Sequence, residues 1–307
     1  MRIVDLASPD KELAFSECGL CLGNFDGVHL GHRALINELK RQNDLRGERL
    51  PLGALLFETP PSFLLGNPVP QLNTLEEKLA LLREAGLSFA ILLDFAALKD
   101  TSPEAFVREV LIEGCKCSIA VCGFNYTFGA RGAGTPSQLA ELFEGEGRTL
   151  SVVPAVTHNG IPVSSSVIRV LLSEGRAKEA AELLGRPFFL TGRVTSGKHL
   201  GAKMGFPTAN LDFPTGALVP AHGVYAARVC IDGQYHQAIC NVGCRPTFDD
   251  GDAVNCEAFL FDFDGNLYGE WMRVYLLDFL RQEQKFDSCE ALERQIALDV
   301  AKTKRLH

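Results

Sequence analysis

The hydrophobic pattern of the chain changes near Gly185. Before this residue, short apolar runs alternate with segments that repeat apolar residues at helical spacing; after it, strand-like runs follow one another directly. Alternating strands and helices are typical of a parallel, doubly wound sheet, whereas consecutive strands joined by turns indicate an antiparallel sheet or barrel. We therefore predict an α/β protein with two domains, residues 1–185 and residues 186–307.

In the first part, the predicted helices carry their own start and stop signals. Thr74 and Glu77 form a capping box and Gly86 is a stop signal, while Ser102 and Pro103 suit the N-cap and the first helical position. Apolar runs typical of buried strands lie between these helices. The helices are predicted to begin at His32, to span Leu75–Ala85 and to span Pro103–Glu113.

The second part shows five strand-like runs between residues 188 and 279. The dipeptides Asp232-Gly233 and Asp264-Gly265 are hairpin signals between such runs. A last amphipathic helix follows, which we expect Asp287 and Glu290 to cap. Its apolar face is formed by Leu292, Ile296 and Val300. We predict an antiparallel sheet or a small barrel with a terminal helix.

Charge and cysteine usage narrow the classes of function. The chain has 307 residues and a net charge of −8, with acidic and basic residues interspersed, so we expect neither a nucleic acid nor a membrane as partner. No export signal or membrane span is apparent, which predicts a cytoplasmic protein with reduced thiols. The Cys18-x-x-Cys21 pair, like Cys115 and Cys117, is interpreted as buried cysteine rather than as a zinc or redox motif. The oligomeric state is not predicted.

A first candidate site lies in the stretch Cys21–Lys40. Here Gly23, Gly27 and Gly31 surround His29 and His32 at the start of a predicted helix. Glycines let the backbone approach an anion, and a helix start offers free N–H groups, so a phosphate site is favoured. Surface histidines remain an alternative. A zinc pair is the weakest interpretation because no third ligand stands out nearby.

Two further segments carry polar residues in patterns suited to phosphate. Ser164 and Ser165 precede a helix with Arg169, which indicates either plain helix caps or a second anion site. Thr208 and Asn210 alternate on one face of a predicted strand. Paired oxygen ligands suit Mg²⁺ carried by a nucleotide, although a turn entering a strand is the simpler interpretation.

These motifs together resemble a known family. H-x-G-H followed by S-S-x-x-x-R is similar to the nucleotidyltransferase superfamily, and the chain from Gly23 to the last helix resembles the bifunctional bacterial riboflavin kinase/FMN adenylyltransferases. The resemblance implies a nucleotidyltransferase-like parallel sheet that transfers an adenylyl group from ATP to FMN. It also implies a C-terminal barrel that phosphorylates riboflavin. The implied ligands are ATP, riboflavin, FMN and FAD, with Mg²⁺ accompanying ATP.

The resemblance also implies roles for individual residues. Glu257 would be the base of the kinase, and His29 and His32 would hold the ATP phosphates and stabilise the transition state of adenylyl transfer. Thr208 and Asn210 would bind Mg²⁺ and phosphate. The flavin-binding candidates are Phe63, Asn125, Phe128 and Arg281, with core packing as the alternative for either phenylalanine. The remaining nucleotide or phosphate-binding candidates are Gly23, Asn24, Asp26, Gly27, Gly31, Ser164, Ser165, Arg169, Gly197, Lys203 and Gly205; Asp26 could equally be a turn residue.

The chain departs from the family pattern at several positions. Thr59-Pro60 replaces a proline and a polar residue, Ala202 replaces an arginine, and Phe259 replaces a histidine. An adenylyltransferase with an impaired kinase half is therefore one alternative function. A flavin-binding protein without turnover is the other.

Overall fold

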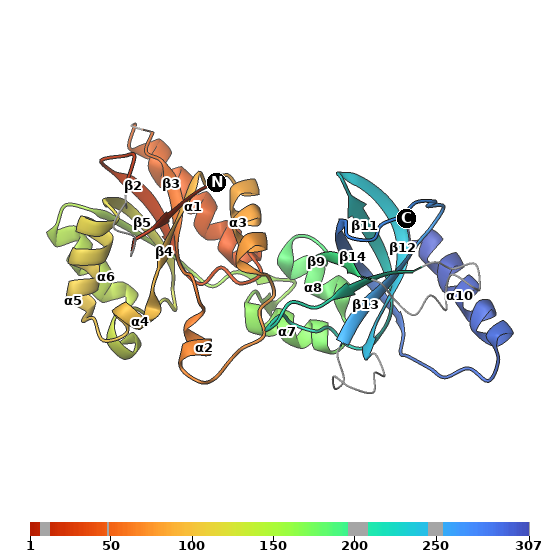
Figure 1. The fold of residues 1–307 in the computed structure, drawn as a ribbon. Coiled ribbons are helices and arrows are strands. Elements are labelled where there is room, and N and C mark those ends of the chain that lie inside the picture. Colours follow the sequence, from red (N-terminus) through yellow and green to blue (C-terminus); the bar gives the residue numbers. More distant parts are fainter. Residues whose placement is uncertain (7–12, 48, 196–207, 245–253, 307) are drawn as a thin grey trace. The chain divides into compact units, whose positions relative to one another are not determined.

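The computed structural model describes residues 1–6, 13–47, 49–195, 208–244 and 254–306 (Figure 1). The chain divides into two compact units, Met1–Ser165 and Ser166–His307. Each unit is described by itself below. The domain boundary predicted from the sequence, between residues 185 and 186, remains a prediction.

The first unit is built on a six-stranded sheet in which every pair of neighbouring strands is parallel, as the sequence predicts. The strand order is β1-β4-β3-β2-β5-β6. A two-stranded antiparallel hairpin, β7-β8, follows β6. The bounds are β1 Arg2–Asp5, β2 Cys18–Leu22, β3 Leu52–Phe57, β4 Phe89–Leu93, β5 Cys117–Gly123, β6 Thr149–Val153, β7 Thr157–His158 and β8 Ile161–Pro162.

Helices connect these strands; the caps predicted at Thr74 and Ser102 are confirmed, whereas the first helix begins at Leu30, two residues before the predicted start at His32. Thr74 and Glu77 form a complete capping box, and Ser102 is an N-cap followed by Pro103. The predicted helix over Pro103–Glu113 begins as an α-helix but continues as a π-helix. The helices are α1 Leu30–Leu45, α2 Pro61–Leu64, α3 Leu75–Glu84, α4 Phe95–Leu98, α5 Pro103–Ala105, the π-helix η1 Phe106–Gly114, the 3-10 helix η2 Ala130–Gly132 and α6 Pro136–Gly145.

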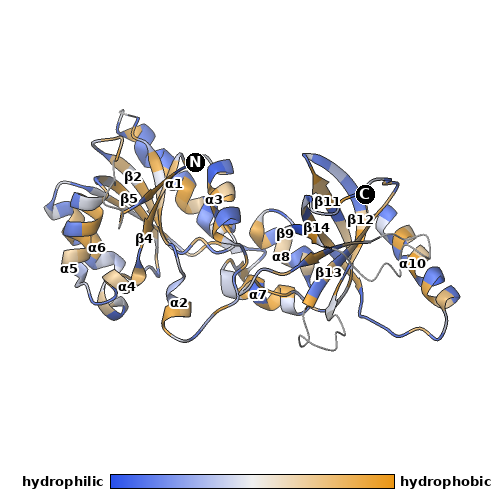
Figure 2. Cartoon of the chain, viewed as in Figure 1, coloured by the Kyte–Doolittle hydropathy of each residue, from blue (hydrophilic) through white to orange (hydrophobic). Residues whose placement is uncertain are grey.

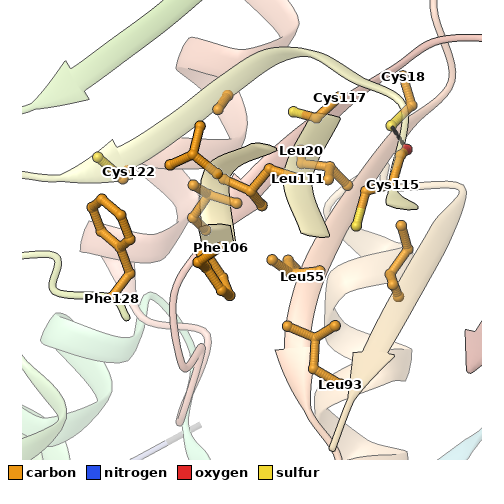
Figure 3. Close-up of a cluster of buried hydrophobic side chains, with 14 of the residues drawn as sticks. Cys18, Leu20, Leu55, Leu93, Phe106, Leu111, Cys115, Cys117, Cys122 and Phe128 are labelled. Carbon is orange, nitrogen blue, oxygen red and sulfur yellow. Dashed lines mark hydrogen bonds between the residues drawn. The ribbon is translucent and has the colours of Figure 1, made fainter. Parts of the chain in front are cut away.

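Cysteines belong to the core of this sheet. Cys18, Cys117 and Cys122 pack among leucine and phenylalanine side chains of neighbouring strands and of η1 (Figure 3). The Cys18 thiol donates a hydrogen bond to the backbone oxygen of Cys115 at 3.2 Å. Burial raises the pKa of Cys122 to about 11 and that of Cys115 to about 12. Because thiolates are the reactive and metal-binding form, the predicted role as buried cysteines is confirmed.

The second unit contains a closed barrel of antiparallel strands in the order β10-β13-β12-β11-β14-β9. This confirms the predicted C-terminal barrel. A terminal helix follows, in which hydrophobic and hydrophilic residues alternate (Figure 2). The bounds are α7 Ser165–Ser173, α8 Ala177–Leu184, β9 Phe188–Thr195, β10 Thr208–Asp212, β11 Gly223–Ile231, β12 Gln234–Cys244, β13 Val254–Leu260, β14 Trp271–Arg281 and α10 Cys289–Lys304.

Two turn and cap assignments in this unit need correction. Asp232-Gly233 does form the β11–β12 hairpin, with φ of 47° and 80°. Asp264-Gly265, however, lies within a longer connection over residues 261–270, because β13 already ends at Leu260. The N-cap of α10 is Ser288, whose hydroxyl accepts a hydrogen bond from the Ala291 N–H. Asp287 therefore lies one position outside the helix cap.

Helices α7 and α8 pack on the barrel. The Ala221 N–H donates to the Leu172 backbone oxygen at 2.9 Å, and the Lys178 ammonium lies 2.9 Å from an Asp278 carboxylate oxygen on β14. Leu183 and Leu184 are 1% and 0% exposed. These contacts make both helices part of the second unit's core.

We therefore expect a fragment of residues 166–307 to be more stable than one of residues 186–307. Deleting α7 and α8 exposes the barrel surface that they cover, and each fully buried leucine contributes about 1.5–3 kcal/mol. Urea unfolding followed by circular dichroism would measure the two midpoints. Equal midpoints would show that α7 and α8 add nothing to the barrel.

Candidate active sites

The glycine-rich loop of residues 23–29 leaves the carboxyl end of β2, where the sheet changes direction. From β2 the chain proceeds to β3 and β4 on one side, whereas β5 and β6 lie on the other. In open parallel sheets, ligands bind beyond the strand ends at this switch point. The topology thus places the loop where a nucleotide would be expected.

The backbone of this loop is strained and buried. Phe25 and Val28 have φ of 51° and 41°, values that are uncommon for residues with side chains, and Gly27 has a φ of 85°. Phe25 and Val28 are 0% and 1% exposed, so core packing holds them in place. Strain of this kind is concentrated at functional sites because the surrounding structure fixes the loop shape in advance.

His29 and His32 lie together at the start of α1. His29 is the N-cap residue, and its Nδ1 accepts a hydrogen bond from the His32 N–H at 3.3 Å. The two rings stack with centroids 3.7 Å apart. A Cβ on Gly31 would approach the His29 ring to 3.0 Å, so a glycine suits this position. Stacked rings do not converge on one metal ion; they present two imidazoles beside the helix N-terminus.

Asp26 joins this loop to two other segments. One oxygen of its carboxylate accepts hydrogen bonds from the Leu72 N–H at 2.9 Å and the Asn73 N–H at 3.4 Å. Its backbone oxygen accepts a bond from the Ser165 hydroxyl at 2.8 Å. Asp26 is 1% exposed. These contacts describe a residue that shapes the loop, and nucleotide contact by its side chain stays a prediction.

Most of the residues that were predicted to bind phosphate in the first unit lie in one region of the structure. Asn24 is exposed on the loop, and Ser164 directly precedes Ser165. Arg169 lies on α7 in the second unit. Its predicted contact with pyrophosphate remains a prediction.

The flavin candidates of the first unit differ in surroundings. Phe63 on α2 is 36% exposed, and Asn125 is exposed just beyond β5 at the switch point. Phe128, by contrast, is buried in the core, with its ring centroid 5.7 Å from that of Phe106 and 5.9 Å from that of Tyr126. The contacts of Phe128 therefore agree with the alternative interpretation, in which this residue packs in the core.

In the second unit, three strands align polar side chains beside Glu257. On β13, Glu257 pairs directly with Asn210 on β10 and with Asn241 on β12. The Asn255 side-chain amide donates to the Asn210 side-chain oxygen at 3.1 Å and to a Glu257 carboxylate oxygen at 3.4 Å. Directly paired residues share a face of the sheet, so the carboxylate is held within a polar row.

This row borders a cavity of about 360 Å³ between the barrel and α10. Thr208, Asn241 and Glu257 line its polar part. A phosphate donor and a flavin both require room, and pockets of this size with a few polar groups are typical ligand sites. The apolar lining comes from Val224, Ile239, Phe259, Phe286, Leu292 and Ile296.

Arg281 also lines the cavity and is fixed by α10. Its guanidinium bonds to an Asp299 carboxylate oxygen at 2.9 Å and lies 5.8 Å from the Phe286 ring centroid. The Gln295 side-chain amide donates to the other Asp299 oxygen at 3.0 Å. Asp299 is 4% exposed. An arginine held in this way can present its remaining donors to a ring system without reorganisation.

Sequence reasoning missed Asn241, Asn255 and Asp299. The two asparagines become visible only when the strand register is known. Gln295 and Asp299 do show helical i,i+4 spacing, which is the one local signal that was available. Gly197, Lys203 and Gly205, which were predicted to bind phosphate, lie outside the described residues, as does Ala202.

Two side chains on β10 have oxygen donors suited to Mg²⁺. Thr208 and Asn210 offer hydroxyl and amide oxygens, the hard donors that Mg²⁺ prefers. Among the described residues, no group of three or more histidine, cysteine, aspartate or glutamate side chains is arranged to hold a metal ion.

In the described parts of the chain, no helix has the length and apolar character to cross a membrane.

Comparisons with known proteins match both units. A family model described as FAD synthetase matches residues 11–167, and one described as riboflavin kinase matches residues 184–307. A bifunctional riboflavin kinase/FMN adenylyltransferase of Listeria monocytogenes is 34% identical over 289 residues, covering 93% of this chain and 91% of the relative. A protein of the same description from Escherichia coli K12 is 34% identical, covering 92% and 90%.

A solved structure matches the fold over nearly the full length. A crystal structure from Streptococcus pneumoniae, described as a macrolide-efflux protein, has a TM-score of 0.89 and 31% identity, covering 99% of both chains.

Proposed function

Because the chain belongs to the bifunctional riboflavin kinase/FMN adenylyltransferase family, and so makes FMN from riboflavin and FAD from FMN, we propose how its two units divide these reactions. The first unit transfers the adenylyl group, and the second phosphorylates riboflavin. The observation that carries this proposal is the match of the FAD synthetase model to residues 11–167 and of the riboflavin kinase model to residues 184–307.

Adenylyl transfer in the first unit uses FMN's own phosphate as the nucleophile. A phosphate oxygen of FMN attacks the α-phosphorus of ATP in line, and the bond to pyrophosphate breaks. The protein therefore has to position the reactants and balance charge, without a covalent intermediate. We assign His29, His32 and the amides at the start of α1 to the triphosphate. Ser164, Ser165 and Arg169 would hold the departing pyrophosphate.

Riboflavin phosphorylation in the second unit needs a proton acceptor. The terminal hydroxyl of the ribityl chain attacks the γ-phosphorus of ATP, the bond from this phosphorus to the bridging oxygen breaks so that ADP leaves, and Glu257 accepts the hydroxyl proton. The hydrogen bond from Asn255 to the Glu257 carboxylate orients this base. The flavin ring would occupy the apolar part of the cavity, with Arg281 at its edge. Thr208 and Asn210 would face the ATP phosphates.

Mg²⁺ is part of this proposal because its preferred ligands are present. Thr208 and Asn210 would contribute oxygen ligands beside the ATP phosphates, and the ion would neutralise phosphate charge. Asn255 donates to the Asn210 side-chain oxygen and so fixes the orientation of that amide.

A cytoplasmic location is also a proposal. Nine cysteines, among them Cys18, Cys21 and Cys289, are free thiols, the state that a reducing compartment maintains. ATP, riboflavin, FMN and FAD are the proposed small-molecule ligands.

One incubation tests the function directly. Purified protein with riboflavin, ATP and Mg²⁺ is expected to yield FMN and then FAD, separated by chromatography. FAD from added FMN but none from riboflavin would indicate an impaired kinase half. Binding of flavin with neither product would contradict the proposed enzyme. A parallel sample with excess chelator is expected to lose both products.

A further inference from the structure

The cavity of the second unit has an ion pair in its apolar wall. Arg281 at the end of β14 and Asp299 on α10 both line this cavity, together with Phe286, Leu292 and Ile296. The side chains of Arg281 and Asp299 are 19% and 5% exposed. A largely buried ion pair contributes little net stability, because the desolvation of both charges offsets their attraction. Its position in the wall of a ligand cavity therefore calls for a functional explanation.

The Asp299 carboxylate has a separate partner for each oxygen. One oxygen lies 2.9 Å from both Nε and Nη2 of Arg281. The other accepts a hydrogen bond at 3.0 Å from the side-chain amide of Gln295, one helical turn earlier on α10. The Asp299 backbone oxygen accepts a bond from the Thr303 hydroxyl at 2.9 Å. Because the carboxylate is held in this way and contacts two guanidinium nitrogens, it fixes the orientation of the guanidinium plane.

The contacts of Arg281 leave defined donors for a ligand. A guanidinium carries five N–H groups in one plane. Nε and Nη2 face Asp299, and Nη1 donates to the Gln282 backbone oxygen at 3.1 Å. Each of these three nitrogens thus uses one N–H on a described residue, so that Nη1 and Nη2 each keep one further N–H. The ion pair presents two donors on neighbouring nitrogens at a fixed place in the cavity wall.

The surroundings of these donors favour a neutral, planar acceptor over a phosphate group. The Asp299 carboxylate offsets the guanidinium charge, and the neighbouring cavity wall is apolar. A phosphate would bring further negative charge close to this carboxylate, whereas an uncharged ring would not. The pyrimidine part of a flavin offers suitable acceptors twice, because it places a carbonyl oxygen beside a ring nitrogen at C4=O and N5 and again at C2=O and N1.

We propose that Asp299 is a positioning residue for flavin recognition: it aims the Nη1 and Nη2 donors of Arg281 at a carbonyl oxygen and the neighbouring ring nitrogen of riboflavin. This inference rests on the proposed function of the second unit. It assigns to Asp299 a role in the affinity for riboflavin and none in the phosphoryl transfer step.

Two riboflavin analogues test the wild-type protein directly. 1-Deazariboflavin and 5-deazariboflavin replace N1 or N5 by C–H and keep the shape of the ring. Because a buried donor without its acceptor is costly, the KM of one analogue in the kinase reaction is expected to exceed that of riboflavin about tenfold. The analogue that is affected identifies the edge of the ring that Arg281 contacts. KM values equal to that of riboflavin for both analogues would overturn the inference.

Asp299→Asn tests the positioning role. Asparagine keeps one acceptor oxygen but turns N–H groups toward Arg281 or Gln295, so the guanidinium loses its fixed orientation. The KM for riboflavin is expected to rise about tenfold while kcat stays unchanged, the pattern of a lost contact that is equally strong in the ground state and the transition state. The KM for ATP should stay at the wild-type value, and the preference for riboflavin over the weaker analogue should disappear. A rise in the KM for ATP alone, or a lower kcat with an unchanged riboflavin KM, would contradict the inference.

A double variant separates recognition from stability. Arg281→Met combined with Asp299→Leu replaces the ion pair by apolar side chains, an exchange that often preserves or raises stability. Thermal unfolding is expected to show a folded protein, and its KM for riboflavin should remain raised. A folded double variant with the wild-type KM would show that the pair has only a structural role. If neither Asp299→Asn nor the double variant folds, the comparison of the analogues with the wild type decides.

Lys302→Met is the matched control. The Lys302 ammonium donates to the Leu280 backbone oxygen at 3.3 Å and so also links α10 to the end of β14, but its side chain is exposed. This variant should lower thermal stability without changing the KM for riboflavin. FMN adenylylation, measured in every sample, is expected to stay constant because the first unit carries it.

The outcomes separate this inference from the proposed function. A wild-type protein that forms no FMN from riboflavin contradicts the proposed function itself. If the wild type forms FMN, equal rises of the riboflavin KM in Asp299→Asn and Lys302→Met overturn the role of Asp299, because any loosening of α10 would then have the same effect.

Discussion

Replacing His29 and His32 together by alanine is expected to abolish FAD formation from FMN, a loss of about 10³-fold or more, while riboflavin phosphorylation persists. Removing one preorganised donor to developing charge typically costs about 10²–10³-fold. Here both stacked rings would be lost from the start of α1. Steady-state assays of the two reactions in the same preparation measure the difference.

The control has to separate chemistry from helix capping, because His29 is also the N-cap of α1. Losing a cap costs about 1 kcal/mol of stability. His29→Asn supplies another good N-cap acceptor without an imidazole, so it should restore stability but not adenylyl transfer. His158→Ala, elsewhere in the same unit, should leave both reactions unchanged. Stoichiometric zinc in the wild type that disappears in the double alanine variant would contradict the phosphate interpretation.

Replacing Glu257 by glutamine is expected to lower riboflavin kinase turnover by roughly 10²-fold or more, the usual scale for a positioned proton acceptor. Glutamine keeps the size of the side chain and an oxygen that can accept from Asn255, so the polar row should stay in place. Binding of riboflavin, followed by flavin fluorescence, is expected to change little. FMN adenylylation should remain near the wild-type rate because the first unit carries it.

Glu270→Gln is a suitable control for this variant. Glu270 lies in the connection before β14 in the same unit and is exposed, so its kinase rate should match the wild type. Equal loss of both activities in Glu257→Gln would indicate misfolding. Unchanged kinase turnover would show that Glu257 is a strand residue without a role as base.

Signals between residues close together in the sequence were sufficient to predict much of the fold. The Thr74–Glu77 capping box, the Asp232-Gly233 hairpin and the left-handed Gly185 at the end of α8 all depend on residues close in sequence. The errors also have a local cause. Asp264-Gly265 carries the same dipeptide signal as a tight hairpin, yet β13 ends early and leaves a longer connection, which the dipeptide alone does not reveal.

The candidate site of the first unit was predictable to a similar degree. Glycines and histidines at a helix start indicate the loop because glycines let the backbone approach an anion and the helix start offers free N–H groups. The burial of Lys78 on α3 was not visible in the same way. A lysine in the pattern of an amphipathic helix is normally solvent-exposed, and only the tertiary structure shows that Lys78 is 4% exposed.

The sequence by itself determined the two kinds of architecture, the helix caps and the motifs that carry the chemistry, because periodicity, capping and turn formation act between residues a few positions apart. Only the tertiary structure decided that Glu257 lies between Asn210 and Asn241, and that Asp299 holds Arg281. These pairs join residues on different strands and helices. Their proximity follows from the register of the closed barrel and the packing of α10, which no local spacing along the chain encodes.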